Sequence, residues 1–240
     1  MRVLQGRAKR RLLTISANSF MVMHTLFQLS ALGHFYHVMN ASFLDRLAQA
    51  RPDPGGGAAA AYAAGVGMAL LTKIIRLEKS RPYNDEFQVK FWTEQLAETR
   101  RLTRIFQHLR QVDVEAYLTM SQALSVRQQG ANLQRAVEEA TRCPWQIMEQ
   151  ALEALELVAS AGAHCRRHLL SDLLVATELL GGALQGAYHI AAANLPLIRS
   201  PHQRQEWAAR LHQASHQGLE ATLRVRSQLV ALVHAAANSA

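Results

Sequence analysis

The chain has 240 residues and a formal net charge of +8, and hydrophobic residues make up 49% of it. That share is enough to build a core, so the composition excludes a globally disordered chain. The two cysteines, Cys143 and Cys165, lack CxxC spacing, which argues against a disulfide framework or a structural zinc module. We therefore expect a reducing compartment and a cytoplasmic location.

The positive charge is concentrated near the N-terminus, where five basic residues precede the first acid, Asp45. The rest of the chain is only mildly basic, and it has no Lys/Arg run with interleaved aromatic residues. These observations argue against a basic DNA-binding regulator, and we predict no nucleic-acid partner. The five residues are Arg2, Arg7, Lys9, Arg10 and Arg11.

Residues 1–38 form an acid-free leader with three interpretations: a weak signal peptide, an arginine-rich transit peptide, or an upstream extension of a protein whose translation starts at Met39. We favour the third, because Met39 opens directly onto a helix start. Polar residues interrupt the apolar stretch of the leader, and we see no other stretch suited to crossing a membrane, so we predict no membrane partner. The predicted domain is 39–240, and we expect the leader to pack poorly onto it.

The first helices are separated by breaks rich in proline and glycine. Ser42 and Asp45 have the spacing of a capping box before a short helix over 43–50. Residues 51–57 break the chain, and 58–79 then form a helix almost without charge until Lys73. A helix that is apolar all round is predicted to be buried.

The middle of the chain has the periodicity of long amphipathic helices. A first helix is predicted to begin at Asp85 and to continue to Leu124, and a second covers 133–160 after a loop at 128–132. Pro144 predicts a kink or a break in the second helix, which should end at Ala161-Gly162-Ala163.

Ser171 is predicted to cap the next helix, which covers 173–193 and is again rich in small residues. Prolines stop it, and a final amphipathic helix follows over 202–236. Because no segment alternates with period two, the predicted fold class is all-α: a helical bundle with a central pair of small-residue-rich helices.

Each polar motif has a structural and a functional interpretation. Gly55, Gly56 and Gly57 before a helix suit anion binding at the helix N-terminus, but also a flexible loop. Asp113 and Tyr117 share a helix face; Asp113, among apolar neighbours, suits an acid or base, but equally a solvated carboxylate. Two histidine pairs at i,i+4 spacing lack the glutamate of a metalloprotease motif, so we predict no metal site.

Several segments in order resemble the formiminotransferase-cyclodeaminase family, over about residues 42–236. The segment at 50–60, Ala-Arg-Pro-Asp-Pro-Gly-Gly-Gly-Ala-Ala-Ala, looks like its opening motif. Asp113-Val-Glu-Ala-Tyr117 resembles Asp-x-Glu-Ala-Phe, and Ala140-Thr-Arg-Cys-Pro144 resembles Ala-x-x-x-Pro. Ser171-Asp172-Leu-Leu-Val-Ala176 is similar to Ser-Asp-x-x-Val-Ala, and Gly186-Ala187-Tyr188 with Asn194-Leu195 to Gly-Ala-x-x-Asn-x-x-x-Asn-Leu.

The chain departs from the family pattern at polar positions. Ala58 stands where the family usually has serine, and Ile190 stands where it has the first asparagine of the last motif. The Gly-Lys-Lys-Tyr-like stretch is altered over 78–83. These changes remove polar groups that orient a pterin, so a non-catalytic folate binder or helical scaffold is an alternative interpretation.

The resemblance implies a homodimeric folate enzyme that acts on the one-carbon bridge of tetrahydrofolate and needs no cofactor besides this substrate. Because no formiminotransferase domain is present, we favour methenyltetrahydrofolate cyclohydrolase over formiminotetrahydrofolate cyclodeaminase. Asp113 is the predicted proton shuttle, and Asp172 is predicted to assist it or to orient the pterin. The predicted substrate-binding residues are Gly55, Gly56 and Gly57 through their amides, Arg76, Lys79 and Arg81 through their charge, and Tyr117 and Asn194.

Overall fold

The structure is a computed structural model that describes residues 43–82, 85–126 and 130–235. The chain divides into two compact units, Met1–Ala50 and Arg51–Ala240. In the first unit residues 43–47 are helical, so the predicted helix is shorter than expected. Its predicted cap, Ser42, and the leader lie outside the described residues.

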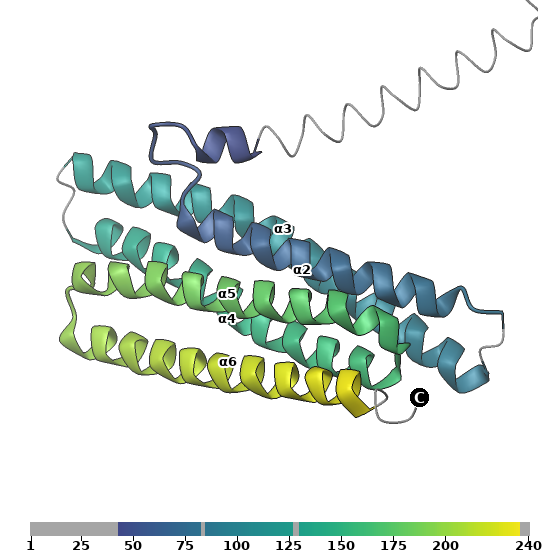
Figure 1. The fold of residues 1–240 in the computed structure, drawn as a ribbon. Coiled ribbons are helices and arrows are strands. Elements are labelled where there is room, and N and C mark those ends of the chain that lie inside the picture. Colours follow the sequence, from purple (N-terminus) through teal and green to yellow (C-terminus); the bar gives the residue numbers. More distant parts are fainter. Residues whose placement is uncertain (1–42, 83–84, 127–129, 236–240) are drawn as a thin grey trace, which may run out of the picture. The chain divides into compact units, whose positions relative to one another are not determined.

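The second unit is an up-and-down helical bundle (Figure 1). The long helices are α2 (Gly56–Lys79), α3 (Glu86–Ser125), α4 (Ala131–His164), α5 (Leu170–Asn194) and α6 (Pro201–Ala235), with 3₁₀ turns η1 (Arg167–Leu169) and η2 (Leu195–Leu197). Across the described ranges the secondary structure is helical and contains no strand. The predicted all-α class is confirmed, as is the single long helix from residue 86 to beyond Leu124.

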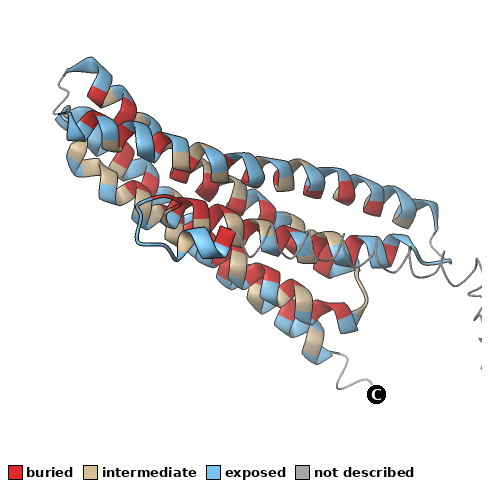
Figure 2. Cartoon of the chain, turned by 90° about the horizontal axis from the view of Figure 1, so that it is seen from above, coloured by how far each residue is buried: buried red, intermediate tan, exposed pale blue. Residues whose placement is uncertain are grey.

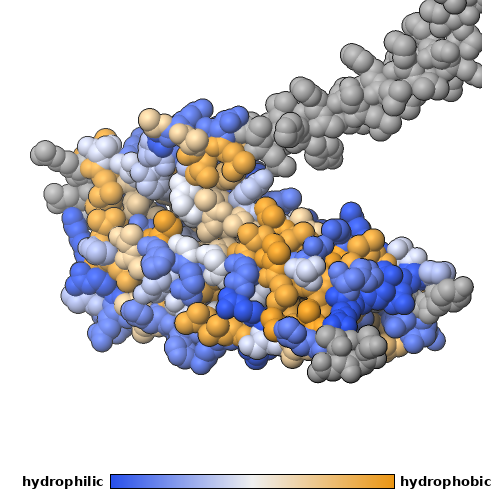
Figure 3. Space-filling model, viewed as in Figure 1, coloured by the Kyte–Doolittle hydropathy of each residue, from blue (hydrophilic) through white to orange (hydrophobic). Residues whose placement is uncertain are grey.

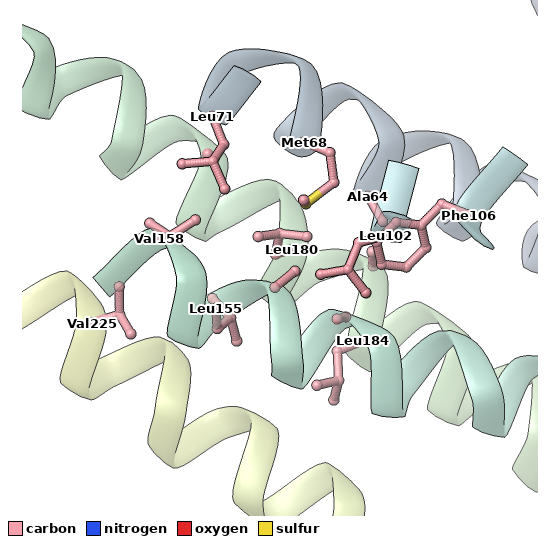
Figure 4. Packing of buried hydrophobic residues seen from close by; sticks show 14 of the residues in the cluster. Ala64, Met68, Leu71, Leu102, Phe106, Leu155, Val158, Leu180, Leu184 and Val225 are labelled. Carbon is pink, nitrogen blue, oxygen red and sulfur yellow. The ribbon is translucent and has the colours of Figure 1, made fainter. Parts of the chain in front are cut away.

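The core lies where α4 and α5 meet the other helices. Helix α5 packs against α2, α4 and α6, and α4 packs against α3, α5 and α6. Figure 2 shows buried residues along the inner faces, and Figure 4 shows how their side chains interdigitate. Each fully buried leucine or methionine of this kind stabilises the fold by about 1.5–3 kcal/mol. Examples are Met68, Leu71, Leu102, Leu155, Leu180 and Leu184.

The two small-residue helices, α2 and α5, pack along each other, as predicted. A Cβ on Gly67 would lie 3.3 Å from the carbonyl oxygen of Ala176, so the missing side chain allows the close approach. However, α2 is not buried all round: Val66 and Ala69 are exposed on its outer face. By length and composition α2 is also apolar enough to cross a membrane, contrary to our expectation, and half of that stretch is buried in the bundle.

Helix α4 continues through both of its predicted interruptions. Pro144 lies inside it without a break, and the helix passes Gly162 before it ends at His164. Gly162 is a packing residue, because a Cβ there would lie 2.3 Å from Leu229 Cδ2 on α6. The glycine therefore lets α6 approach α4 and does not end the helix.

The start of α5 also differs from the prediction. The helix begins at Leu170, directly after η1, and its N-cap residue is Leu169. Ser171 lies inside the first turn and makes no capping hydrogen bond, so its predicted role is wrong. The preceding 3₁₀ turn replaces a side-chain cap as the way into this helix.

Candidate functional site

The glycine loop and Asp113 come together at the beginning of α2. Gly55 is the N-cap residue, and its extended backbone has no side chain to satisfy the first amides of the helix. The carboxylate of Asp113, from the middle of α3, accepts a hydrogen bond from the Ala58 backbone N–H. A Cβ on Gly57 would lie 2.0 Å from Asp113 Oδ1. Gly57 is therefore required for this approach, and Asp113 caps α2 from a neighbouring helix.

The environment of Asp113 raises the pKa of its carboxyl group. The residue is only 8% exposed. Burial raises the pKa from the ordinary value of 3.8, and the Ala58 amide offsets part of that rise. No lysine or arginine forms an ion pair with it in the described ranges. A carboxyl group in such a setting can exchange a proton nearer to neutral pH than a solvated one.

Two of the departures from the family pattern, Ala58 and Ile190, lie at the glycine loop beside this site. Ala58 is the residue whose amide binds Asp113. Ile190, from α5, approaches the same loop, since a Cβ on Gly56 would lie 2.8 Å from Ile190 Cδ1. The wall that the family pattern makes polar is thus apolar in this chain.

Cys143 is a neighbour of Asp113 that the sequence did not single out as functional. Its thiol lies 3.5 Å from the Leu109 carbonyl oxygen, to which it donates a weak hydrogen bond. Burial, with smaller contributions from Asp113 and Glu139, raises its pKa to about 12. Cys143 is therefore a neutral thiol and not a nucleophile. The feature of the sequence that could have drawn attention to Cys143 is its position directly before Pro144.

The predicted partner carboxylate, Asp172, lies at the opposite end of α2. Its Oδ2 is 2.7 Å from Nζ of Lys73. From Ala58 to Lys73 the helix rises by about 22 Å, at 1.5 Å per residue. Within one chain Asp172 therefore does not enter the site of Asp113, because the antiparallel packing of α2 and α5 places the start of α5 beside the end of α2.

The predicted basic cluster is also remote from the glycine loop, since Arg76 and Lys79 lie on the last turn of α2. Arg81 Nη1 is 3.1 Å from Oε2 of Glu78. Glu78 is 1% exposed and also accepts hydrogen bonds from the backbone N–H and Nε of Arg166. Arg81 therefore belongs to a clamp that joins the end of α2 to the chain before α5.

Asn194 has a packing role that explains two of the short motifs together. Its Nδ2 donates a hydrogen bond to the Ala140 carbonyl oxygen, at 2.8 Å. In a regular helix that oxygen would accept from the N–H four residues later, and Pro144 has none. Asn194 thus satisfies the carbonyl that Pro144 leaves free. Tyr117, by contrast, is 36% exposed one turn after Asp113.

Two grooves lie between the helices of the bundle, and one of them is lined by sequence neighbours of Asp113. A groove of about 770 Å³ runs between α3 and α4, and it is lined by Val112 and Ala116, which flank Asp113 on α3. A second groove, of about 660 Å³, lies between α4 and α6. Asp113 lines neither groove. No group of three or more potential metal ligands occurs in the described part of the chain.

The fold and the motifs define a class of helical protein with a glycine loop capped by a buried aspartate. The family model for formiminotransferase-cyclodeaminase matches residues 39–213, and the chain belongs to that family. Among solved structures it is similar to the formiminotetrahydrofolate cyclodeaminase of Thermotoga maritima, with a TM-score of 0.73 and 20% identity. The match covers 80% of this chain and 95% of that one. A comparison with curated proteins finds no match.

Proposed function

We propose that this chain closes 5-formiminotetrahydrofolate to 5,10-methenyltetrahydrofolate with release of ammonia. The family supports a folate enzyme, and a solved structure with the same fold is called a formiminotetrahydrofolate cyclodeaminase. The observation that carries the proposal is the buried Asp113 carboxyl, which accepts a hydrogen bond from the Ala58 amide next to the glycine loop and has a raised pKa. No cofactor besides the folate is needed.

The reaction requires one group that moves a proton between two nitrogens. N10 attacks the formimino carbon, and a bond forms between them to give a tetrahedral carbon. The formimino group enters as the protonated amidinium form, so its terminal nitrogen already carries two hydrogens. Asp113 takes the proton from N10 and delivers it to that nitrogen, which then carries three. The bond from carbon to that nitrogen then breaks and ammonia leaves. A carboxyl group with a pKa above that of a solvated aspartate suits both transfers.

The second candidate is the hydrolytic opening of 5,10-methenyltetrahydrofolate to 10-formyltetrahydrofolate. In that reaction Asp113 takes a proton from the attacking water and passes it to N5 as the bond from N5 to the carbon breaks, and the remaining hydroxyl proton is released to solvent as the formyl C=O forms. We favoured this reaction from the sequence alone. We now place the cyclodeaminase reaction first, because the solved structure that the chain resembles is called a formiminotetrahydrofolate cyclodeaminase and is matched over 95% of its length.

An absorbance assay of the methenyl chromophore separates the candidates. Cyclodeaminase activity makes the chromophore appear from 5-formiminotetrahydrofolate, with ammonia released in equal amount. Cyclohydrolase activity makes it disappear from 5,10-methenyltetrahydrofolate faster than in buffer. If 5-formyltetrahydrofolate binds and neither reaction is accelerated, the chain is the non-catalytic folate binder that Ala58 and Ile190 favour. If no folate binds, the proposal is wrong.

We further propose that the chain forms a homodimer through the outer faces of α2 and α5. Apolar surface gathers over these helices in Figure 3, and Val66, Ala69 and Val175 are among the exposed residues there. The α2 part of this face carries no charge before Lys73. A dimer at micromolar concentration by light scattering, converted to a monomer by Val66→Lys, is the expected result; a wild-type monomer would refute it.

A further inference from the structure

The groove between α3 and α4 has the size and lining of a small-molecule site. Its volume of about 770 Å³ lies within the usual range for ligand pockets. Three alanines, Ala116, Ala123 and Ala136, leave room between the two helices. A flat ring can lie on such a floor without displacing a larger side chain. The end of α3 and the beginning of α4 border this region in Figure 1.

The groove is lined by sequence neighbours of the candidate proton shuttle, although Asp113 itself does not line it. Val112 and Ala116 line it from α3, on either side of Asp113 in the sequence. Glu139 lines the groove from α4, and Cys143 follows it one turn later. The charges of Asp113 and Glu139 both contribute to the raised pKa of the Cys143 thiol, so Cys143 lies near both carboxylates. A ligand with its reacting atoms at Asp113 can therefore extend into the groove.

The charged residues that line the groove are mostly acidic. Glu115 and Glu139 lie on its walls, whereas Arg135 is the one lining cation among the residues that the structure describes. Arg135 is exposed and makes no ion pair or hydrogen bond in the described part of the chain. It lies about 12 Å along α4 from Cys143, at 1.5 Å per residue. An anionic group is therefore attracted to Arg135, and a benzoyl group with an amide can span the distance to it from Cys143, the neighbour of Asp113.

We propose that this groove binds the aminobenzoyl-glutamate arm of the folate, with Arg135 pairing with a carboxylate of the glutamate. This inference rests on the proposed function, because it takes the reacting one-carbon bridge to lie at Asp113. The benzoyl ring lies on the alanine floor, and the glutamate extends toward Arg135. In this proposal Arg135 takes the place of Arg76, Lys79 and Arg81 of the same chain as the anchor of the glutamate tail. Those three residues lie at the other end of α2.

The test compares two ligands that differ only in the glutamate: 5-formyltetrahydrofolate and 5-formyltetrahydropteroate. Their dissociation constants are measured by calorimetry for the wild type and for Arg135→Gln. We expect Arg135→Gln to weaken 5-formyltetrahydrofolate binding about tenfold, as for loss of one charge-assisted hydrogen bond. Binding of the pteroate should change less than twofold. A role of Arg135 in the fold alone would affect both ligands alike.

Two further variants sharpen the result. Arg104→Gln removes an exposed arginine of α3 outside the groove and is the matched control, with no change for either ligand. Thr119→Trp places a large ring in the groove from an exposed position and should weaken both ligands, because both carry the benzoyl group.

Equal effects of Arg135→Gln on the two ligands, or no effect, would overturn the groove assignment while folate binding by the wild type still stood. The groove assignment would also be overturned if Arg76→Gln, and not Arg135→Gln, weakened the binding of 5-formyltetrahydrofolate without weakening that of the pteroate. Failure of the wild type to bind either ligand would instead overturn the proposed function, and this inference with it.

Discussion

The two ends of α2 each meet a buried carboxylate, and the two groups are shifted in opposite directions. At the start of the helix, burial raises the pKa of Asp113, and one backbone amide offsets it only in part. At the end, burial also acts to raise the pKa of Glu78, but hydrogen bonds from Arg166 and Arg81 outweigh it and the pKa is lowered. Burial alone therefore does not determine the protonation behaviour of either group; the partners do.

The difference separates a structural carboxylate, Glu78, from the proposed proton shuttle, Asp113. Glu78 gains from being ionised in the folded protein, so its contribution to stability is present above its ordinary pKa of 4.5 and is lost as the pH falls through its lower folded value. Asp113 is the reverse, because its raised pKa disfavours the ionised form and this cost disappears as the pH falls below 3.8. Glu78 stays ionised because arginines pair with it. Asp113 has no such ion pair among the described residues, so its carboxyl group can exchange a proton more easily.

The largest effect should be on turnover in Asp113→Asn. The amide keeps the shape and one acceptor for the Ala58 amide, but it cannot carry a proton, so the turnover number should fall by about 10²–10⁴-fold. In the wild type the acidic limb of the pH–rate profile should lie above pH 3.8, in line with the raised pKa. Glu78→Gln is the matched control and should alter turnover by less than about threefold. Wild-type turnover in Asp113→Asn would remove the proton-shuttle role and leave a helix cap.

Glu78→Gln should instead lower the free energy of unfolding, by about 3 kcal/mol at neutral pH. It leaves Arg166 and Arg81 without their anion, and removing one partner of a buried pair costs about 3–5 kcal/mol. The lower end applies because both arginine side chains are about 40% exposed. Urea unfolding measures the difference, which should shrink below pH 4.5. A gap that persists at pH 3 would mean that the shape of Glu78, and not its charge, is what the clamp needs.

Gly57→Ala should have an intermediate effect at the reactive end. The new Cβ would lie 2.0 Å from Asp113 Oδ1, so the carboxylate or the helix must move. Such overpacking costs about 1–3 kcal/mol of stability, and we expect turnover to fall with it. Gly65→Ala is the control on the same helix, since its Cβ would meet nothing within 4 Å in this chain. Equal stability and activity in the two variants would show that the Gly57 contact adapts freely.

The periodic features of the fold could be predicted from the sequence, and the contacts between helices could not. Helix α3 is amphipathic over its whole length, and its extent was predicted almost to the residue. Gly162 was predicted to help end the helix and Pro144 to kink or break it, but these local rules hold only when no neighbouring helix compensates. Leu229 fills the space at Gly162, and Asn194 binds the carbonyl that Pro144 frees.

The same limit explains the candidate site. Gly57 and Asp113 were singled out as separate motifs, and the structure brings them together. Asp172 was assigned to the site from the family resemblance, and Arg76 was assigned to the folate tail from its charge alone. Their distance from Asp113 follows from which ends of α2 and α5 are neighbours, and a sequence without pairing information does not contain that. Arg135 carried no motif, so only the groove indicates it.

The smallest expected effect concerns the Asn194 hydrogen bond, and it tests whether Pro144 and Asn194 act as a pair. Asn194→Ala leaves the Ala140 carbonyl oxygen without its donor, and an unsatisfied polar group of this kind costs about 1–2 kcal/mol. Pro144→Ala restores an N–H that can bond the same oxygen within α4. In the Pro144→Ala background, Asn194→Ala should therefore cost less than half as much. A double-mutant cycle by urea unfolding measures this coupling, and residues in contact commonly show about 0.5–3 kcal/mol. Additive effects would mean that Asn194 stabilises the end of α5 in some other way, and that the two motifs are adjacent without depending on each other.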